Sequence, residues 1–560
     1  MPDLPSQIAH LAVIVESLIN DILNEARPIT RRPTGRPSTK GFDMVYTITQ
    51  DAINKQLASL SGQTIPTHIT IGDSETNGAS ISGTIGSPSL GFNTGEVHLA
   101  SLHIPFTNGT FNYYTGHGPS QTVKTFNVAG WVIAFNIKLN IAQLAHEYTT
   151  ASKVIPEEVL NTLSKFDSNM FNIYSIFMEF ENSDLATYDA KSSFPGADDI
   201  TKKAFGDLIR VWLLNHKGTD NPFIIGYPIV KNESSYLQEV FEPCGANFST
   251  TPNTSGQEGL STLNILMVTG DRDMQSDPAL SRADAGLFNR SLVTSADADG
   301  KVIIASETFC QIYIYSLLVK PLGDKLQSLP NFAHSRPDRG PNVDIYNKTF
   351  GFILDEDGRS WHYGDHIKLS WHESGFNSHD RESEQNLQYK VQLCTENDAS
   401  GTPRLTLNIS GSVYRYEWDQ LNTDIPPFKS NVYVGKGWAN ATLSFVTKLQ
   451  FIAQGDGNVQ ITQASQQNLP VTNSGTEGMY KFADFFNGIL SLNQISEDWA
   501  SNGASLGAIE GDIISNFINS TGPIINSAMS KIVFPGKNEF VYHNIQMNSD
   551  GDIELDLKYR

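Results

Sequence analysis

Hydrophobic and polar residues alternate most regularly near the two ends of this 560-residue chain. From Phe42 to Ile48 a large side chain occupies almost every second position, as in a half-buried strand. The spacing then becomes helical as far as Leu60, with Thr49 placed as the N-cap. Near the other end, Asp550-Gly551 is a strong hairpin signal before an alternating run that reaches Tyr559. The pattern predicts that both regions are structural strands.

Residues 41–330 are predicted to form a strand-rich module with several helices. One strand is expected to run unbroken from Phe126 to Ile141, well beyond the usual length of about five or six residues. A long, curved sheet accommodates such a strand better than a compact sandwich does. Asn108-Gly109 is expected to form a turn. Helices are predicted over residues 156–166, 201–216 and 307–326.

Residues 331–560 are predicted to form a second strand-rich module, which ends in a long helix and the hairpin. The helix is expected over Ser505–Val533, with an apolar stripe that reaches Ile532 and a kink at Gly522-Pro523. The strands include four tryptophans: Trp361, Trp371, Trp418 and Trp438. The predicted fold class is α+β, with long, strongly curved antiparallel sheets wrapped around long helices in an elongated chain of one or two modules.

Residues 1–40 are predicted to form a separate segment, an amphipathic helix followed by a basic, proline-broken linker. We expect this helix to dock on the protein's own sheet, on a partner or on a membrane surface. Its acidic polar face argues against the membrane, although arginines of the linker could contact anionic headgroups. A solvated linker explains the arginines equally well. The candidate binding residues are Leu11, Val15, Leu18, Ile22, Arg31, Arg32 and Arg36.

The composition excludes several classes of function. A formal net charge of −21 repels nucleic acid and anionic membranes, so no nucleic-acid partner is expected. No segment has the ~20 apolar residues that a membrane-spanning helix needs. The first Lys or Arg is Arg27, too late for the basic region of a signal peptide. The cytoplasm is therefore the default location, with release or export by a route without a classical signal peptide left open.

Two patterns raise the question of a metal site. His362 and His366 are four residues apart, so on a strand they would share a face and could both bind zinc, but no third ligand is fixed. The acidic turns at 297–300, 355–358 and 456–457 are explained as hairpin turns without calcium. The sequence also lacks a nucleophile elbow, a phosphate loop and a His-Glu-x-x-His motif. We expect no metal, no cofactor and no enzymatic activity.

Several segments resemble the clostridial forty-seven-kilodalton protein family, which accompanies some botulinum neurotoxin gene clusters together with the OrfX proteins. The resembling segments occur in the family's order and are Gly41–Tyr46, Asn172–Phe180, Ile224–Ile229, Leu263–Val268, Phe534–Gly536 leading to Phe540, and Gly551-Asp552 leading to Tyr559. The resemblance implies a TULIP (tubular lipid-binding) fold, no catalytic site, and sister proteins of the same gene cluster as partners. It assigns a lipid-binding role to no residue of this chain.

Three functions follow as hypotheses. The first is a non-enzymatic protein of a toxin-associated cluster that binds protein partners and a lipid, by its headgroup or in a hydrophobic groove. The second is a pure assembly scaffold, in which the groove is filled and the N-terminal helix recruits a partner. The third is a hydrolase or metalloenzyme with a site made from dispersed residues such as His362 and His366.

Overall fold

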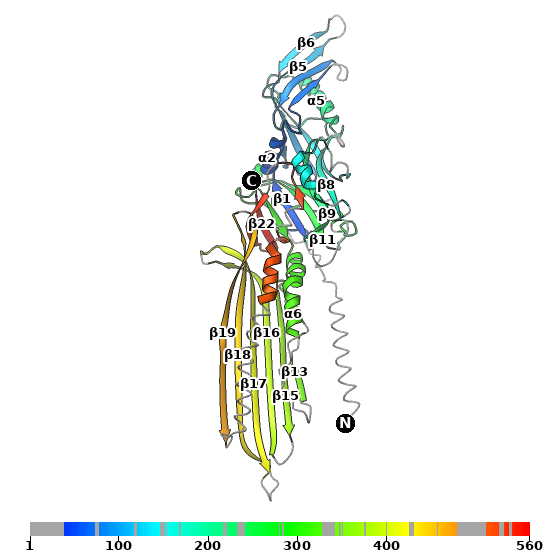
Figure 1. Ribbon diagram of the computed structural model, residues 1–560. Helices are drawn as coiled ribbons and strands as arrows, with labels where there is room; N and C mark the ends of the chain where they lie inside the picture. Colours follow the sequence, from blue (N-terminus) through cyan, green and yellow to red (C-terminus); the bar gives the residue numbers. More distant parts are fainter. Residues whose placement is uncertain are drawn as a thin grey trace. The chain divides into compact units, whose positions relative to one another are not determined.

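The computed structural model separates the chain into two compact units (Figure 1). Among the described residues, unit 1 contains 309–452 and 461–521, and unit 2 contains 38–308, 453–460 and 522–560. The structure describes residues 38–559 except 73–77, 117–119, 146–151, 153, 167, 169, 217–220, 232–240, 271, 279, 283–284, 328–341, 347–348, 350, 374–376, 399, 425–430, 456, 479–510, 523, 526–530 and 537–539. The described part is a β-rich α+β fold, as predicted.

Unit 2 contains a six-stranded sheet whose strand order is β10-β11-β1-β12-β22-β21. Its strands are β1 (Met44–Thr49), β10 (Pro243–Thr251), β11 (Thr262–Thr269), β12 (Gly300–Ile304), β21 (Phe540–Met547) and β22 (Ile553–Tyr559). The strand β1 pairs with β11 on one side and with β12 on the other, antiparallel in both cases. Every residue of β1 is buried, so this strand lies in the centre of the sheet.

The two end segments form the predicted elements. Helix α2 (Gln50–Leu60) follows β1 directly, and the Thr49 hydroxyl accepts the backbone N–H of Ala52 at 3.2 Å. The hairpin β21–β22 turns at Gly551, whose positive φ of 88° favours glycine. The hairpin had been expected within a second module over residues 331–560. Its strand β22 instead pairs with β12, so it completes the sheet that contains β1.

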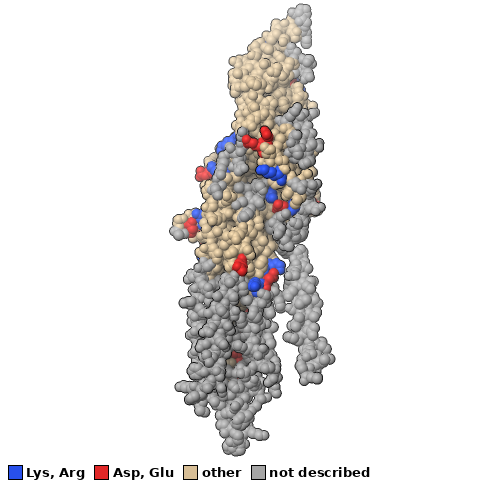
Figure 2. All heavy atoms as spheres, in the orientation of Figure 1, with Lys and Arg blue, Asp and Glu red and all other residues tan. Residues whose placement is uncertain are grey.

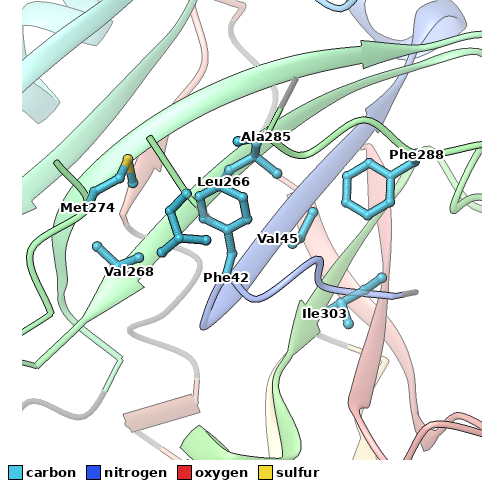
Figure 3. Close-up of a cluster of buried hydrophobic side chains, with 9 residues drawn as sticks. Phe42, Val45, Leu266, Val268, Met274, Ala285, Phe288 and Ile303 are labelled. Atoms are coloured by element: carbon cyan, nitrogen blue, oxygen red, sulfur yellow. The ribbon is translucent and has the colours of Figure 1, made fainter. Parts of the chain in front are cut away.

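The core of this sheet is an apolar cluster around Phe42 and Val45 (Figure 3). Side chains from β11, from β12 and from the segment after β11 close around these two residues; they are Leu266, Val268, Met274, Leu280, Ala285, Phe288 and Ile303. The cluster joins segments that are more than 200 residues apart in the sequence. Burial of this kind contributes about 25 cal/mol for each Å² of apolar surface removed from water.

A buried ion pair accompanies the apolar cluster. The Asp43 carboxylate accepts hydrogen bonds from Arg272 Nη1 at 2.9 Å, from the Thr308 hydroxyl at 3.2 Å and from the backbone N–H of Thr269 at 2.8 Å. Arg272 also bonds to Asp277 at 3.0 Å. These contacts connect β1, the end of β11 and the residues that follow β12.

The second sheet of unit 2 has nine strands, in the order β2-β3-β5-β7-β8-β9-β20, with β4 and β6 also paired to β5. Its strands are β2 (His68–Ile71), β3 (Ala79–Ile85), β4 (Ser89–Gly91), β5 (Leu99–Thr115), β6 (Thr122–Asn127), β7 (Val132–Gln143), β8 (Phe171–Glu179), β9 (Ile224–Lys231) and β20 (Ile532–Val533). Two helices of this unit, α4 (Glu157–Leu163) and α5 (Asp199–Leu214), begin close to the predicted positions. The short helix η4 (Glu258–Leu260) precedes β11.

The predicted single strand from Phe126 to Ile141 is wrong, because β6 ends at Asn127 and β7 begins at Val132. Between them the Trp131 N–H bonds to the Val128 carbonyl, and Gly130 adopts a φ of 81°. Val128 and Trp131, which the predicted alternation places on opposite faces, are both buried because the turn lies between them. Side-chain alternation alone therefore did not reveal the turn.

The turn predicted at Asn108-Gly109 is also wrong, because β5 runs through it without interruption. Gly109 has a φ of 138° and lies opposite Gly83 of β3. A Cβ atom on Gly109 would lie 2.5 Å from the Gly83 Cα. Here glycine permits two strands to approach closely at an irregularity in their register, rather than a reversal of the chain.

Unit 1 is built on a seven-stranded antiparallel sheet with the order β13-β15-β16-β17-β18-β19, in which β14 also pairs with β15 (Figure 1). The strands are β13 (Asn342–Tyr346), β14 (Ile353–Leu354), β15 (Ser360–Glu373), β16 (Asn377–Asn397), β17 (Pro403–Asp424), β18 (Asn431–Ala453) and β19 (Val459–Gly478). Four of these strands have 20 or more residues, whereas the long strand expected from the sequence was at 126–141. The acidic turn at 355–358 joins β14 to β15, as predicted.

Two consecutive helices, the π-helix η5 (Glu307–Val319) and α6 (Lys320–Gln327), occupy the region predicted as one helix. The buried pairs Phe309–Cys310, Tyr313–Ile314 and Leu318–Val319 recur at intervals of four and five residues. An i→i+5 helix aligns these pairs on one stripe, whereas an α-helix would spread them around its axis. The apolar stripe therefore accounts for the unusual geometry.

The predicted helix over Ser505–Val533 is correct only in its middle. Residues 511–522 are helical, while residues 505–510 lie outside the described part of the chain. The expected apolar stripe does not reach Ile532, because Ile532–Val533 is the strand β20, which pairs with β9. The kink predicted at Gly522-Pro523 involves a residue outside the described ranges.

Candidate functional site: two faces of the unit 1 sheet

One face of the unit 1 sheet, here called the apolar face, is filled by the protein's own helices. Trp361, Val391 and Ile409 lie side by side on β15, β16 and β17, and each is at most 1% exposed. Phe309 of η5 packs against Phe451 of β18, with ring centroids 6.0 Å apart. Over the described rows, side chains rather than a groove occupy this face.

The helix at residues 511–522 completes this filling. Its Phe517 is 1% exposed and contacts Tyr313 of η5, with a centroid distance of 6.1 Å. Ile514, one turn earlier, is also buried. Helix and sheet thus form a packed core in the described part of unit 1.

The opposite face, here called the polar face, carries a hollow lined by small and hydrophilic residues. Two rows of paired residues cross four strands: His362–Lys390–Ser410–Val446 and Gly364–Gln388–Ser412–Ser444. The residues that β17 and β18 contribute to these rows include the small side chains of Ser410, Ser412 and Ser444, and the surface above them is a hollow of about 760 Å³. Thr349 closes one side, where its hydroxyl donates to the Gly364 carbonyl at 2.8 Å.

Beside this hollow, β17 presents three aromatic side chains on the same face. Tyr414, Tyr416 and Trp418 follow Ser412 at every second residue, and each is half-buried. We call these three residues the aromatic row. In register, Asn386, Glu384 and Glu382 of β16 lie opposite its three members. The aromatic row was not identified from the sequence, although Trp418 had been noted as part of an alternating strand.

Charged neighbours of the aromatic row are paired with one another. Lys368 bonds to Glu382 at 2.7 Å, and His366 Nε2 bonds to Glu384 at 2.7 Å. Partial burial and the negative charge of Glu384 raise the pKa of Tyr414. Burial and Glu382 likewise raise the pKa of Tyr416. The tyrosines therefore stay neutral hydroxyl groups at physiological pH.

The two predicted metal-ligand candidates, His362 and His366, both lie on the polar face of β15 but do not share a site. His362 Nδ1 is 2.5 Å from Asp355, whereas His366 bonds to Glu384. Four residues of strand span about 13 Å, too far for two side chains to bind one zinc ion. The structure therefore does not bring the two histidines together as ligands of one ion. Among the described residues, no three potential ligands form a cluster that could hold a metal ion.

A Ser–His contact on β5 is the kind of pair that a hydrolase could use. Ser101 Oγ lies 2.9 Å from His103 Nε2. Burial and the nearby Lys191 lower the pKa of His103, which favours the neutral imidazole that a general base requires. Ser101, however, is 2% exposed, so its hydroxyl is closed to a substrate. The pair is a part-buried hydrogen bond within β5.

Unit 2 contains a second hollow, of about 790 Å³, between α4 and the turn that follows α2. Its wall is largely apolar, with Ile155, Val159 and Leu160 on one side and Pro535 on another. The polar edge contains Thr64, whose buried hydroxyl oxygen has no hydrogen-bond partner. Such a volume falls within the range of about 300–1,000 Å³ that is typical of small-molecule pockets.

The candidate residues of the N-terminal segment, from Leu11 to Arg36, lie outside the described residues, so their role stays a prediction. On the face of unit 2 seen in Figure 2, acidic and basic side chains lie near one another rather than in a patch of one sign. In the described part of the chain, no helix has the length and apolar character needed to cross a membrane.

Comparisons with known proteins find two similar solved structures. The structure is similar to the crystal structure of P47 of Clostridium botulinum E1, with a TM-score of 0.45 and 14% identity, covering 93% of this chain and 100% of the other. It is also similar to P47 from Clostridium botulinum A2, with a TM-score of 0.42 and 12% identity over 94% and 99% of the two chains. No protein-family model and no curated protein matches the sequence.

Proposed function

We propose that this chain is a non-enzymatic, TULIP-type binding protein that assembles with sister proteins of a toxin-associated gene cluster. The sequence resemblance supplies the biological setting. The structural observation that supports binding to proteins, rather than transport of a lipid inside unit 1, is the packed apolar face. A hydrophobic ligand would have to displace Phe309 and Phe517, both at most 1% exposed.

We propose that the N-terminal segment recruits the protein partner, as in the scaffold hypothesis above. The experiment compares the full chain with a variant that lacks residues 1–37 and begins at Ser38. The deletion spares Ser38, whose hydroxyl bonds to the buried Asp552 and therefore belongs to the fold of unit 2. Each form is co-expressed with the proteins encoded beside its gene, and the complexes are isolated.

The full chain is expected to co-purify with at least one neighbour, and the shortened chain with none, while both give the same unfolding curve. Retention of the partner by the shortened chain would place the binding surface on the folded units instead. Failure of the full chain to bind any neighbour would contradict the proposal as a whole.

A hydrophobic ligand is a second element of the proposal, and the pocket beside α4 is the place that favours it. The variant Leu160→Trp would narrow this pocket, whereas Ile200→Trp adds the same ring at a site that is 64% exposed on α5. Organic extraction and mass spectrometry of the purified proteins are expected to detect lipid in the wild type and in Ile200→Trp but not in Leu160→Trp. If the wild type contains no lipid and does not bind liposomes, the lipid part of the proposal is wrong and the pure assembly scaffold is the function.

A further inference from the structure

The polar face of the unit 1 sheet has the features of a carbohydrate-binding surface. We propose that it binds a neutral, linear glycan, with successive sugar rings on Tyr414, Tyr416 and Trp418 and one end of the glycan in the hydroxyl-lined hollow. This proposal is independent of the recruitment of protein partners by the N-terminal segment.

The aromatic row has the geometry of a stacking platform. Alternate residues of an antiparallel strand are about 6.8 Å apart and point to the same face. Tyr414, Tyr416 and Trp418 therefore form a straight row of half-buried rings. A pyranose ring has an apolar face of C–H groups, and such a face packs well on an aromatic ring, which combines a large apolar area with a polar tip.

The surroundings of the row supply partners for sugar hydroxyl groups. Glu384 and Glu382 lie opposite Tyr416 and Trp418 on β16, and a carboxylate has two oxygens that can accept several hydrogen bonds. Each carboxylate uses one close contact, to His366 or to Lys368, which holds it in place. Asn386, opposite Tyr414, adds an amide donor and acceptor.

The hollow extends the same surface beyond Tyr414. Ser412 is the next residue of the row on the polar face of β17, and its register partners are Gln388 and Ser444. These three residues have hydroxyl or amide side chains in place of aromatic rings, and they line the hollow of about 760 Å³. Hydroxyl and amide groups can donate and accept, as the end of a glycan chain requires.

The charges and polarity of the face distinguish a glycan from other macromolecules. Nucleic acid is opposed by the carboxylates beside the rings and by the net charge of −21. The buried centre of a protein interface is typically poor in charged groups, whereas here the Lys368–Glu382 ion pair flanks Trp418 and the Glu384 carboxylate lies opposite Tyr416. Pairing of these charges also disfavours a strongly anionic polysaccharide.

Affinity electrophoresis of the full-length chain tests the proposal. Native gels contain hydroxyethylcellulose, barley β-glucan, glycol chitin or dextran, and the migration of the protein is compared with that in a plain gel. The wild type is expected to be retarded by at least one of these polymers. The variant Tyr416→Ala/Trp418→Ala should bind it at least tenfold more weakly. Tyr114→Ala, which removes a half-buried aromatic ring from β5 of unit 2, serves as the matched control and should bind normally.

A second variant distinguishes loss of the binding surface from loss of folding. Ser412→Phe fills the hollow and leaves the aromatic row intact, and it too should weaken binding while the unfolding curve stays that of the wild type. The proposal is overturned if none of the four polymers retards the wild type, or if the double variant is retarded as strongly as the wild type. If the double variant loses a protein partner while no polymer binds, the face is a protein interface and the glycan proposal is wrong.

Discussion

Breaking the buried ion pair between Asp43 and Arg272 should strongly destabilise unit 2. The substitution Asp43→Ala removes acceptors from Arg272, Thr269 and Thr308 at once. Removal of one partner of a buried pair costs about 3–5 kcal/mol, because the other charge stays buried. Arg272 keeps its bond to Asp277 and is 20% exposed, so the loss should lie near the lower limit, about 3 kcal/mol.

Urea unfolding followed by tryptophan fluorescence measures this loss, with separate transitions fitted for the two units because a single two-state transition is not expected for such a chain. The matched control is Asp207→Ala, which breaks a surface pair with Arg210 at 3.4 Å. Exposed pairs contribute at most about 1 kcal/mol, so this variant should unfold almost as the wild type does. The double variant Asp43→Ala/Arg272→Ala should lose less than the sum of the two single losses.

Two results would refute this reasoning. One is an Asp43→Ala variant that is no less stable than Asp207→Ala. The other is strict additivity in the double variant, which would mean that Asp43 and Arg272 stabilise the fold independently rather than through their contact.

Three further predictions concern single side chains. Gly109→Ala should lower the free energy of unfolding of unit 2 by about 3 kcal/mol. Gly130 also has a positive φ but has open space around it, so Gly130→Ala should lower it by only about 1–2 kcal/mol. Equal decreases in urea unfolding would refute the close approach of the strands. The Asp198 cap of α5 has its pKa lowered to about 2, mainly by hydrogen bonds from Thr201, so its stabilising effect should be complete above pH 3.8 and disappear as the pH falls towards 2. The melting temperatures of wild type and Asp198→Ala should therefore converge in acid, and a constant difference would contradict this. Burial and the neighbouring Glu396 raise the pKa of the Cys394 thiol, so Glu396→Gln should accelerate its alkylation by iodoacetamide at pH 8, and an unchanged rate would show that burial alone controls the thiol.

Local patterns were sufficient to predict the elements whose signals are contained within a few residues. The cap at Thr49, the turn at Gly551 and the alternation over Ile553–Tyr559 each depend on neighbouring residues, and all three were confirmed. The neighbours of β22 could not be inferred in this way. Its pairing with β12 is a contact between segments roughly 250 residues apart, and no local pattern specifies it.

The errors have a common physical cause, because tertiary contacts gave the same local pattern a different structure. Gly109 was expected in a turn, but the close approach of Gly83 retains it within a strand. Ile532 continued a helical stripe in the sequence, but pairing with β9 makes it part of a strand. The repeat of η5 fits a π-helix, a geometry too rare to be expected from sequence.

The candidate binding surface was predictable only in part. Trp418 belongs to an alternating run, so its place on a strand could be predicted. Its position beside Glu382, and the continuation of the row into the hollow, depend on the register between β16 and β17. The pairing of β15 with β14 and with β16 likewise gives each histidine its own carboxylate partner.

The pairing of β12 with β22 has a consequence for synthesis on the ribosome. After Ile304 emerges, roughly 250 further residues must be made before Ile553 is available to pair with it. At about 5–20 residues per second, the edge of β12 waits about 10–50 seconds for its permanent neighbour. An unpaired edge can bond to other nascent chains, so a chaperone that shields this strand during translation should increase the yield of folded protein.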